Sequence, residues 1–357
     1  MIADALGAQA AHNPAYRVRV MLPRPALARN GIEIRPLPLL SEEEDRIFRG
    51  AGLPGRLRVA SRARRRLLDE IRRREGGPDI TLIQRQADMF PSLRVERAAI
   101  DERRFVLDVD DAIWRDARGA GGHPLAALKG SGRKLRWMVA RADQVIAGNR
   151  LLAEWLGKHS DQVAVVPSLI DPAGVEPRAH ADSERLTLGW IGSPPTAPYL
   201  RRLRDVIAAL GRDLAPRGRS VRLLVVGAPG LRLDGVAQES WPWSERAERE
   251  ALDQMDIGLM PLPDTPWTRG KCAYKALVYM NAGIPLVADD VGVTAEVVGP
   301  SGGLVVRGED AWREALLELA GDVALRARLG AAGRERVSEA YSVERWAPEL
   351  ARLLRGG

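Results

Sequence analysis

Short apolar runs alternate with helix-like segments along this chain, and the alternation stops once and then restarts. The runs ITLIQ, FVLDV and QVIA have the length and composition of buried strands. Residues 171–185 are rich in proline, alanine and charge and have no periodicity, and the strand-like runs LTLGWI, VRLLVV and IGLM follow them. Strand–helix alternation is typical of parallel sheets covered by helices. We therefore predict an α/β protein whose two halves are joined by a linker.

Length and composition narrow the class of protein. At 357 residues the chain is long enough for two domains. No apolar stretch reaches the roughly 18–20 residues that span a bilayer, and the first residues lack a signal-peptide pattern. Cys272 is the only cysteine, which excludes an internal disulfide and favours a reducing, cytoplasmic location. The four histidines are scattered, so we expect no metal site.

The lysines of this chain are few and unevenly placed. Only five of the 54 basic residues are lysines, and Lys271 and Lys275 lie within five positions of each other. The excess of arginine, together with the alanine and glycine content, indicates codon bias in a GC-rich genome. The arginines therefore carry little functional information by their number, whereas the lysine pair requires an explanation.

The lysine pair lies at the start of a predicted helix. Four apolar residues from 273 to 280 share one helical face, with Lys271, Lys275 and Val278 on the opposite side; they are Ala273, Ala276, Leu277 and Met280. Gly283 fits the position just after this helix, and the run IPLVA is a short buried strand. After a turn at Gly292, we expect Thr294 to cap a short helix that begins at Ala295 and Glu296.

Two interpretations of the lysine pair are open. A helix dipole disfavours cations near the helix N-terminus by about 0.3–1 kcal/mol, and Arg269 adds to the mismatch. A solvated basic helix start is the simpler interpretation. The other interpretation is a bound phosphate or diphosphate. Such an anion would make the arrangement favourable, because free backbone N–H groups, the helix dipole and both lysines attract negative charge.

The position of the lysine pair in the second half of the chain supports the interpretation that the pair binds an anion. Ligands of open α/β sheets bind beyond the carboxyl ends of the strands. The strands LTLGWI and VRLLVV run into the glycine-containing exits GSPP and GAPG, with Gly192 and Ser193 in the first and Gly227 in the second. The full G-x-G-x-x-G pattern of a dinucleotide site is missing, so we reject that function.

At this point the sequence resembles a known family. The segment 256–306, DIGLMPLPDTPWTRGKCAYKALVYMNAGIPLVADDVGVTAEVVGPSGGLVV, resembles the donor-binding core of the group 1 glycosyltransferases, often called family 4. Five other segments resemble further parts of these enzymes: GWIGSPPTAPYL, VRLLVVGAPG, FVLDVDDAIW, ADQVIAGNRLLAEWL and GRERVSEAYSVERWAPELARLL. The resemblance therefore covers nearly all of the chain after residue 16.

The resemblance implies a GT-B fold, in which two Rossmann-like domains with parallel sheets face a central cleft. We expect an acceptor-side domain over residues 1–178, a nucleotide-sugar domain over 179–340 and a closing helix over 341–357. The implied reaction moves a sugar from a nucleotide-diphosphate sugar to a glycan, a lipid-linked or a small acceptor, with retention and without a cofactor or metal. A role in cell-envelope polysaccharide synthesis fits this activity.

The resemblance also implies site residues. Positive groups stabilise the departing diphosphate when no metal does, and Lys271 and Lys275 are the expected catalytic pair. We expect further donor contacts from one set of residues: Gly192, Ser193, Gly227, Arg269, Gly283, Thr294, Ala295 and Glu296. Asp110 and Asp111 end a strand of the first half; contact with the acceptor and a plain turn or helix cap are both open.

The sequence departs from the family in two places. Many members carry two glutamates where this chain has Gly270 and Val278, and a valine cannot accept hydrogen bonds from a ribose. The usual opening strand and glycine-rich loop are at best short in MIADALGAQ. The valine motivates a second hypothesis, a degenerate GT-B protein that serves as a binding or scaffold subunit. A sugar-nucleotide epimerase is a third, although no carboxylate–histidine cluster supports proton abstraction.

Two arginine clusters, at 62–66 and 72–74, are compatible with peripheral contact with an anionic membrane, as for a lipid-linked acceptor. A solvated basic face is the alternative. Nucleic-acid binding is disfavoured, because no aromatic residues are interleaved with the arginines and only 5% of the chain is aromatic.

Overall fold

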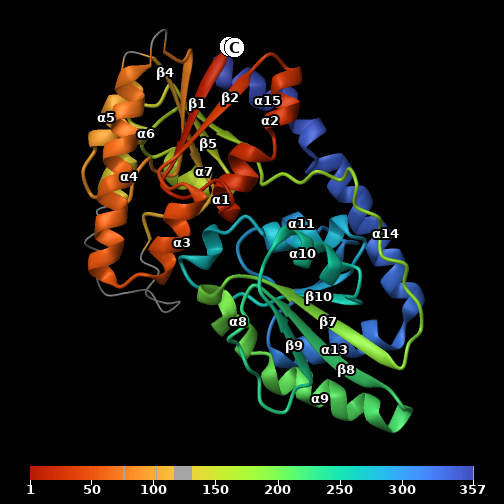
Figure 1. The fold of residues 1–357 in the computed structure, drawn as a ribbon. Helices are drawn as coiled ribbons and strands as arrows, with labels where there is room; N and C mark the ends of the chain where they lie inside the picture. Colours follow the sequence, from red (N-terminus) through yellow and green to blue (C-terminus); the bar gives the residue numbers. More distant parts are fainter. Residues whose placement is uncertain (75–76, 102, 116–130, 357) are drawn as a thin grey trace.

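The structure is a computed structural model that describes residues 1–74, 77–101, 103–115 and 131–356. It contains two six-stranded sheets in which every strand pairing is parallel. Figure 1 shows them as two lobes, one built mainly from the first half of the chain and one from the second. The predicted GT-B architecture is confirmed.

The first sheet has the order β2-β1-β3-β4-β5-β6. Its strands are β1 (Ile2–Gly7), β2 (Glu33–Pro38), β3 (Ile80–Gln84), β4 (Arg104–Val109), β5 (Gln144–Ala147) and β6 (Val163–Val165). All five residues of β3 are buried, as expected for a central strand covered on both faces. The opening strand, which the sequence left in doubt, is present as β1 and pairs with both β2 and β3.

Helices cover both faces of the first sheet. They are α1 (Pro14–Tyr16), continued by a π-helical turn over Arg17–Met21, α2 (Arg24–Arg29), α3 (Glu42–Gly50), α4 (Leu53–Arg73), α5 (Arg94–Ile100), α6 (Ser131–Val139) and α7 (Arg150–Leu156). Ser41 and Glu44 form a reciprocal capping box that fixes the start of α3. In α4 the buried face holds Ala60, Ala63 and Leu67, whereas Leu57 is 52% exposed.

The second sheet has the order β12-β11-β10-β7-β8-β9. Its strands are β7 (Arg185–Ile191), β8 (Ser220–Val226), β9 (Gln238–Trp241), β10 (Ile257–Met260), β11 (Leu286–Asp289) and β12 (Gly303–Val306). The helices are α8 (Ala197–Arg201), α9 (Arg204–Leu214), α10 (Glu245–Leu252), α11 (Tyr274–Asn281), α12 (Thr294–Val298), α13 (Glu309–Gly321), α14 (Val323–Ala340) and α15 (Val343–Arg355). Ser244 caps α10 by accepting a hydrogen bond from the Ala247 N–H.

The last helix returns to the first lobe. In Figure 1, α14 runs along the edge of the second lobe and α15 lies beside α2 of the first. Leu350, Leu353 and Leu354 of α15 are buried in one apolar cluster with residues of β1, β2 and β3. The Arg104 side chain of β4 donates hydrogen bonds to the carbonyls of Leu353 and Leu354 at 3.0 and 2.7 Å. The predicted boundaries at 178 and 340 remain our proposal for the limits of the domains.

Candidate active site

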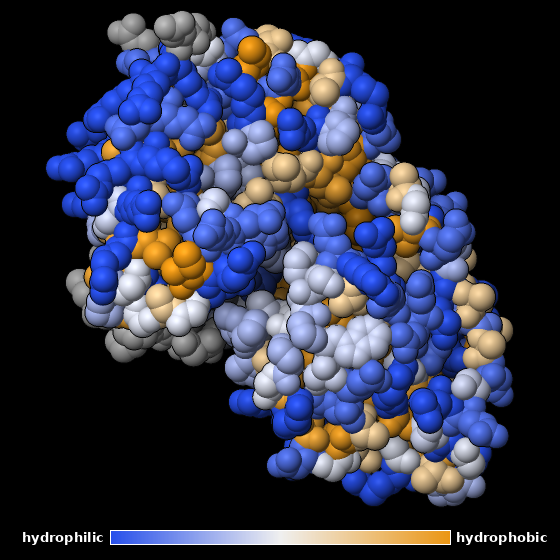
Figure 2. Space-filling view, viewed as in Figure 1, coloured by the Kyte–Doolittle hydropathy of each residue, from blue (hydrophilic) through white to orange (hydrophobic). Residues whose placement is uncertain are grey.

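The two lobes meet at the loop that carries Lys271. Asn149, which caps α7, donates hydrogen bonds from its amide to the carbonyls of Gly270 and Lys271 at 3.1 and 3.3 Å. The Cys272 Sγ donates to the carbonyl of Asp110 at 3.2 Å. A Cβ at Gly148 would lie 2.6 Å from this sulfur, so the approach of the lobes requires glycine there. In Figure 2 the lobes touch across a narrow hollow.

Lys275 lies in the first turn of α11, which begins under strain. Ala273, the residue before the helix, has left-handed backbone angles (φ 50°, ψ 31°) that non-glycine residues adopt at a cost, and no side chain caps the helix. The Tyr279 Oη of the same helix accepts a hydrogen bond from the Ile191 N–H at 2.9 Å, which ties α11 to the end of β7. The first turn of α11 is thereby held at the exit of that strand.

The Lys275 side chain is partly buried, and its amine has no acidic partner among the described residues. Its Nζ lies 4.4 Å from the centre of the Trp190 ring, and a Cβ at Gly192 would approach it to 2.8 Å. Within the described residues no carboxylate lies within ion-pair distance of this amine. Burial, and secondly the charge of Lys271, lower the pKa of Lys275 to about 7. Cation–π contact offsets only part of such desolvation, so a nearby anion would stabilise the charged form of this amine.

Lys271 faces the first lobe. Its Nζ lies 3.4 Å from the Asp111 Oδ2 and 5.2 Å from the centre of the Trp267 ring. The same Asp111 Oδ2 lies 3.6 Å from a guanidinium nitrogen of Arg85. Asp110 is held within its own lobe by Arg85, at 2.5 and 2.9 Å, and by Gln84. Of the two aspartates predicted on the acceptor side, only Asp111 contacts the second lobe through its side chain.

The strand exits that the sequence singled out lie together. The Gly192 N–H donates to the Val226 carbonyl at 2.9 Å. Gly227 has a φ of +92°, and a Cβ there would lie 2.1 Å from the Gly192 carbonyl oxygen. Both glycines are therefore required by the close packing of the exits of β7 and β8 beneath Lys275. Ser193 follows on the exposed side of the same exit.

The remaining donor-contact predictions have mixed outcomes. Arg269 forms a two-pronged ion pair with Asp264 of its own loop, at 2.6 and 2.9 Å. Gly283 has a φ of +67° and ends α11, so that it lies at the opposite end of the helix from Lys275. The structure does not bring Gly283 to the lysines, because its role there is to let the helix terminate.

The predicted cap of α12 is wrong. The helix includes Thr294, whose hydroxyl donates backward to the Val291 carbonyl at 2.7 Å instead of capping the helix. Ala295 is exposed in the first turn. The Glu296 carboxylate accepts a hydrogen bond from Arg150 of the first lobe at 3.0 Å, so this side chain joins the lobes in the present arrangement.

Val278 does not lie on an open face of its helix, contrary to the expectation from its spacing. It is 7% exposed and belongs to an apolar cluster that also contains Ile191 and Leu277. All residues of α11 from Ala276 to Asn281 are buried, because the helix is covered by α12 and α14 as well as by the sheet. The sequence pattern, interpreted as one buried and one solvent-facing side, therefore predicted too little burial for α11.

Sequence reasoning missed Trp190 and the contacts of Arg17 between the lobes. Trp190 is completely buried beneath Lys275, and its indole nitrogen has no hydrogen-bond partner among the described atoms. Its place two residues before Gly192 was the available signal. Arg17 of the first lobe lies 5.3 Å from the centre of the Trp243 ring and 4.0 Å from the Glu245 carboxylate. Neither contact has a local sequence signal, because the partners are more than 200 positions apart.

Two parallel-sheet lobes that meet at the loop carrying Lys271 define a two-domain α/β protein. Comparison with known proteins shows what the chain resembles. Residues 185–322 match the family model described as "Glycosyl transferases group 1". A GDP-mannose-dependent monoacylated alpha-(1-6)-phosphatidylinositol monomannoside mannosyltransferase of Corynebacterium glutamicum is 39% identical over 215 residues. That match covers 53% of this chain and 55% of the relative, about half of each.

Solved structures extend the likeness to the whole chain. A sucrose-phosphate synthase from Thermosynechococcus elongatus superposes with a TM-score of 0.68, at 14% identity, over 99% of this chain and 98% of its own. Anabaena HepE, solved with UDP and glucose, gives a TM-score of 0.67 at 13% identity over 100% of both chains. The resemblance drawn from the sequence is confirmed: residues 185–322 match the group 1 glycosyltransferase model, and the chain as a whole has the GT-B fold.

Proposed function

We propose that this protein is a glycosyltransferase that takes a sugar from a nucleotide-diphosphate sugar and transfers it, with retention, to a glycan, lipid-linked or small acceptor. The observation that carries the proposal is the Lys275 amine, which is partly buried at the exits of β7 and β8 and has no acidic partner in the described parts of the chain. A diphosphate would supply the missing charge.

The chain's own residues suggest how the leaving group is stabilised. The charge of Lys271 disfavours the charged form of Lys275 in the free site. A diphosphate between them relieves this repulsion, and the negative charge that grows on it as the glycosidic bond breaks strengthens both contacts. We propose that this pair acts where other enzymes use a metal ion, and that backbone N–H groups at Gly192 and in the first turn of α11 complete the cradle.

A nucleotide screen tests the proposal most economically. UDP, GDP and ADP are added separately to the protein, and the melting temperature is recorded. We expect one of the three nucleotides to raise the melting temperature by several degrees. A ligand that binds only the folded state adds RT ln(1 + [L]/Kd) to its stability, which is about 2.7 kcal/mol when the ligand concentration is 100 times Kd. The stabilising nucleotide then identifies the donor to be tested for turnover.

One observation favours the scaffold alternative. The glutamate common in the family is replaced by Val278, which is buried among apolar side chains, so that this position offers no acceptor for ribose hydroxyls. If no nucleotide shifts the melting temperature, the protein is a binding or scaffold subunit with a GT-B fold. Release of an altered nucleotide sugar in the absence of an acceptor would instead identify an epimerase.

We also propose peripheral contact with the inner face of the membrane. No helix in the described part of the chain is long and apolar enough to span a bilayer. Three large apolar residues are exposed at the corner between α3 and α4, namely Ile47, Leu53 and Leu57. Arginines flank them in the sequence, which favours an anionic surface. Sedimentation with vesicles containing anionic lipid, and with neutral vesicles, tests this contact.

A further inference from the structure

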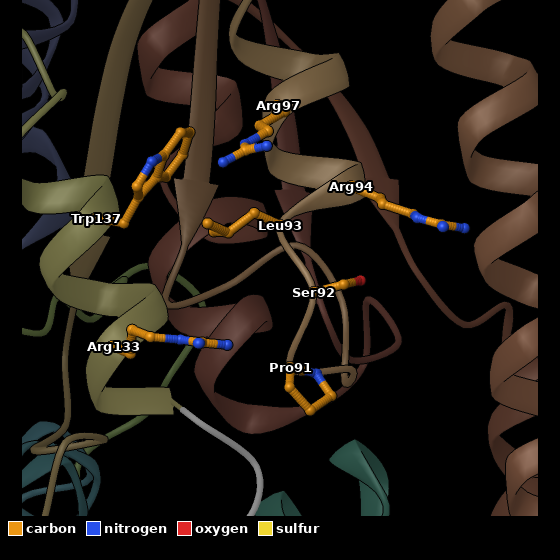
Figure 3. A pocket seen from close by; sticks show the side chains of 7 residues that line it. All are labelled: Pro91, Ser92, Leu93, Arg94, Arg97, Arg133 and Trp137. Atoms are coloured by element: carbon orange, nitrogen blue, oxygen red, sulfur yellow. The ribbon is translucent and has the colours of Figure 1, made fainter.

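The first lobe contains a cavity that the proposed donor site does not use. Its volume is about 420 Å³, and it lies between the segment that leads into α5 and the first turns of α6. Pro91, Leu93 and Trp137 give it apolar walls, and Arg97 and Arg133 stand at its edge. In Figure 3, the Arg97 and Arg133 side chains extend toward Leu93 from two sides, whereas Arg94 points away.

The guanidinium groups of this cavity are not neutralised. Elsewhere on the surface, arginines pair with carboxylates, as Arg313 does with Asp213 at 2.7 Å. Across the ranges that the structure describes, no ion pair involves Arg97 or Arg133, and no acidic residue lines the cavity. The Arg97 guanidinium lies 5.5 Å from the centre of the Trp137 ring, which holds it at the cavity without reducing its charge.

A buried ion triad fixes the walls of the cavity. The Lys134 Nζ, next in sequence to Arg133, lies 2.6 Å from carboxylate oxygens of both Asp88 and Glu96. It also donates to the Phe90 carbonyl at 3.2 Å. Because Lys134 belongs to α6, Glu96 to α5 and Asp88 to the preceding loop, one cation links all three walls. The cavity is therefore a preformed feature of the lobe, which lowers the ordering cost of binding.

The start of α6, which carries Arg133, lies close to the segment that follows Asp111. Gly132 precedes Arg133, and a Cβ there would lie 3.7 Å from Trp114. Trp114 is stacked on Trp155 with ring centres 3.9 Å apart, and it lies three positions after Asp111, the residue that contacts Lys271. The cavity and Asp111 therefore belong to the same lobe.

From this arrangement we propose that the cavity binds the phosphate group of an organic phosphate whose apolar body packs against Leu93 and Trp137. Two guanidinium groups without carboxylate partners match the planar, two-pronged recognition of phosphate oxygens, and the apolar walls favour a phosphoester over the free ion. The assignment of this phosphate to the acceptor rests on the glycosyltransferase function proposed above. The binding itself does not.

Binding of two probes by calorimetry tests the site. Phenyl phosphate represents a soluble phosphoester, and dihexanoyl phosphatidic acid, used below its micelle concentration, represents a lipid. We expect at least one to bind, and the Arg97→Gln/Arg133→Gln variant to lose affinity by about tenfold or more. Arg62→Gln/Arg136→Gln is the matched control, because it removes two exposed arginines of the same lobe that do not line the cavity. Leu93→Glu, which places a carboxylate in the cavity, should abolish binding independently.

The outcomes separate the sources and the hypotheses. Stronger binding of the lipid than of phenyl phosphate identifies a lipid phosphate, and the reverse identifies a soluble one. The proposal is overturned if neither probe binds, if both cavity variants bind as the wild type does, or if the control loses as much affinity as the cavity variant. UDP, GDP and ADP titrations of the same proteins report on the donor site alone, so failure of the proposed function and failure of this inference are distinguishable.

Discussion

Two lysines of this protein, one in each lobe, lie in opposite chemical settings. Lys134 is 1% exposed and lies between two carboxylates at 2.6 Å. Lys275 is partly buried against Trp190, and the described residues provide no carboxylate for it. The first amine is neutralised within the fold, whereas the second carries an electrostatic cost that only a partner from outside can relieve.

The difference teaches how to distinguish a structural cation from a functional one. A triad that is complete in the free protein stabilises local packing and leaves no charge for a ligand. A partly buried amine whose pKa falls to about 7 is poised for an anion, since a negative ligand restores its charge. Substitution of Lys134 should therefore lower mainly the stability of the protein, whereas substitution of Lys275 should lower mainly its activity.

Lys134→Met should give the largest effect on stability. It leaves Asp88 and Glu96 together without a cation, and loss of one partner of a buried ion pair costs about 3–5 kcal/mol. Urea denaturation measures the change in the free energy of unfolding. The variant Lys134→Met/Asp88→Asn/Glu96→Gln should recover part of the loss, because no uncompensated charge remains. A loss below about 1 kcal/mol for the single variant would show that the triad does not hold the lobe together.

Lys275→Met should give the largest effect on activity. We expect turnover to fall by about 10²–10³-fold, the loss typical of a removed electrostatic stabiliser of the transition state. The free energy of unfolding should fall by less than about 1 kcal/mol or rise, since the variant removes a desolvated charge. Lys158→Met, at an exposed lysine, is the control and should change neither quantity. Full turnover by the Lys275 variant would end its assignment as a catalytic residue.

The pH dependence of nucleotide binding should report the titration of Lys275. Its pKa of about 7 lies below the ordinary 10.5, and a diphosphate binds the charged amine better than the neutral one. Affinity should therefore fall as the pH rises above 7, by up to about tenfold per unit until the pKa of the complex is reached. Calorimetric titrations from pH 7 to 9 measure the slope, and the slope should be absent in Lys275→Met.

The lowered pKa of Lys275 also determines how its contribution to the free energy of unfolding changes with pH. Between pH 7 and 10.5 the unfolded chain binds more protons at this lysine than the folded protein does, so the contribution of Lys275 to stability rises with pH across this window. Below pH 7 the amine is charged in both states and its desolvation cost is fully present. Subtraction of the Lys275→Met profile from that of the wild type isolates the contribution.

Asp111→Asn should give the smallest effect. It removes the carboxylate that lies 3.4 Å from the Lys271 Nζ and competes with a nucleotide for that cation. Partly exposed pairs contribute about 0.2–1 kcal/mol, so nucleotide affinity should rise by about two- to fivefold. Asp161→Asn, at an exposed aspartate, serves as the control in the same titrations. A loss of affinity would instead show that Asp111 positions the lysine.

The fold was largely predictable because its signals are local. Buried runs such as ITLIQ and VRLLVV formed the strands β3 and β8, and Gly283 ended α11 as its position indicated. The burial of Val278 was not predictable from helical spacing, because α12 and α14 cover the face that a two-sided pattern assigns to solvent. The hydroxyl of Thr294 had two possible backbone partners, and the sequence did not distinguish a cap from the backward bond observed.

The site was predictable in part. The lysine pair and the glycine exits followed from composition and strand position, whereas the surroundings of each lysine required tertiary contacts. Trp190 beneath Lys275 and Asp111 opposite Lys271 come from distant segments of the chain. The fact that Lys134 is paired and Lys275 is not depends on Asp88 and Glu96, about 40 positions before Lys134. Spacing along the chain carries no information on such partners.

The central claim is that Lys275 is the unpaired cation of a diphosphate site. Calorimetric titration of the wild type and of Lys275→Met with the nucleoside diphosphate that stabilises the protein tests it most directly. We predict tight binding by the wild type and at least about tenfold weaker binding by the variant, with melting curves of the free proteins that agree within a few degrees. Equal affinity of the two proteins would contradict the account.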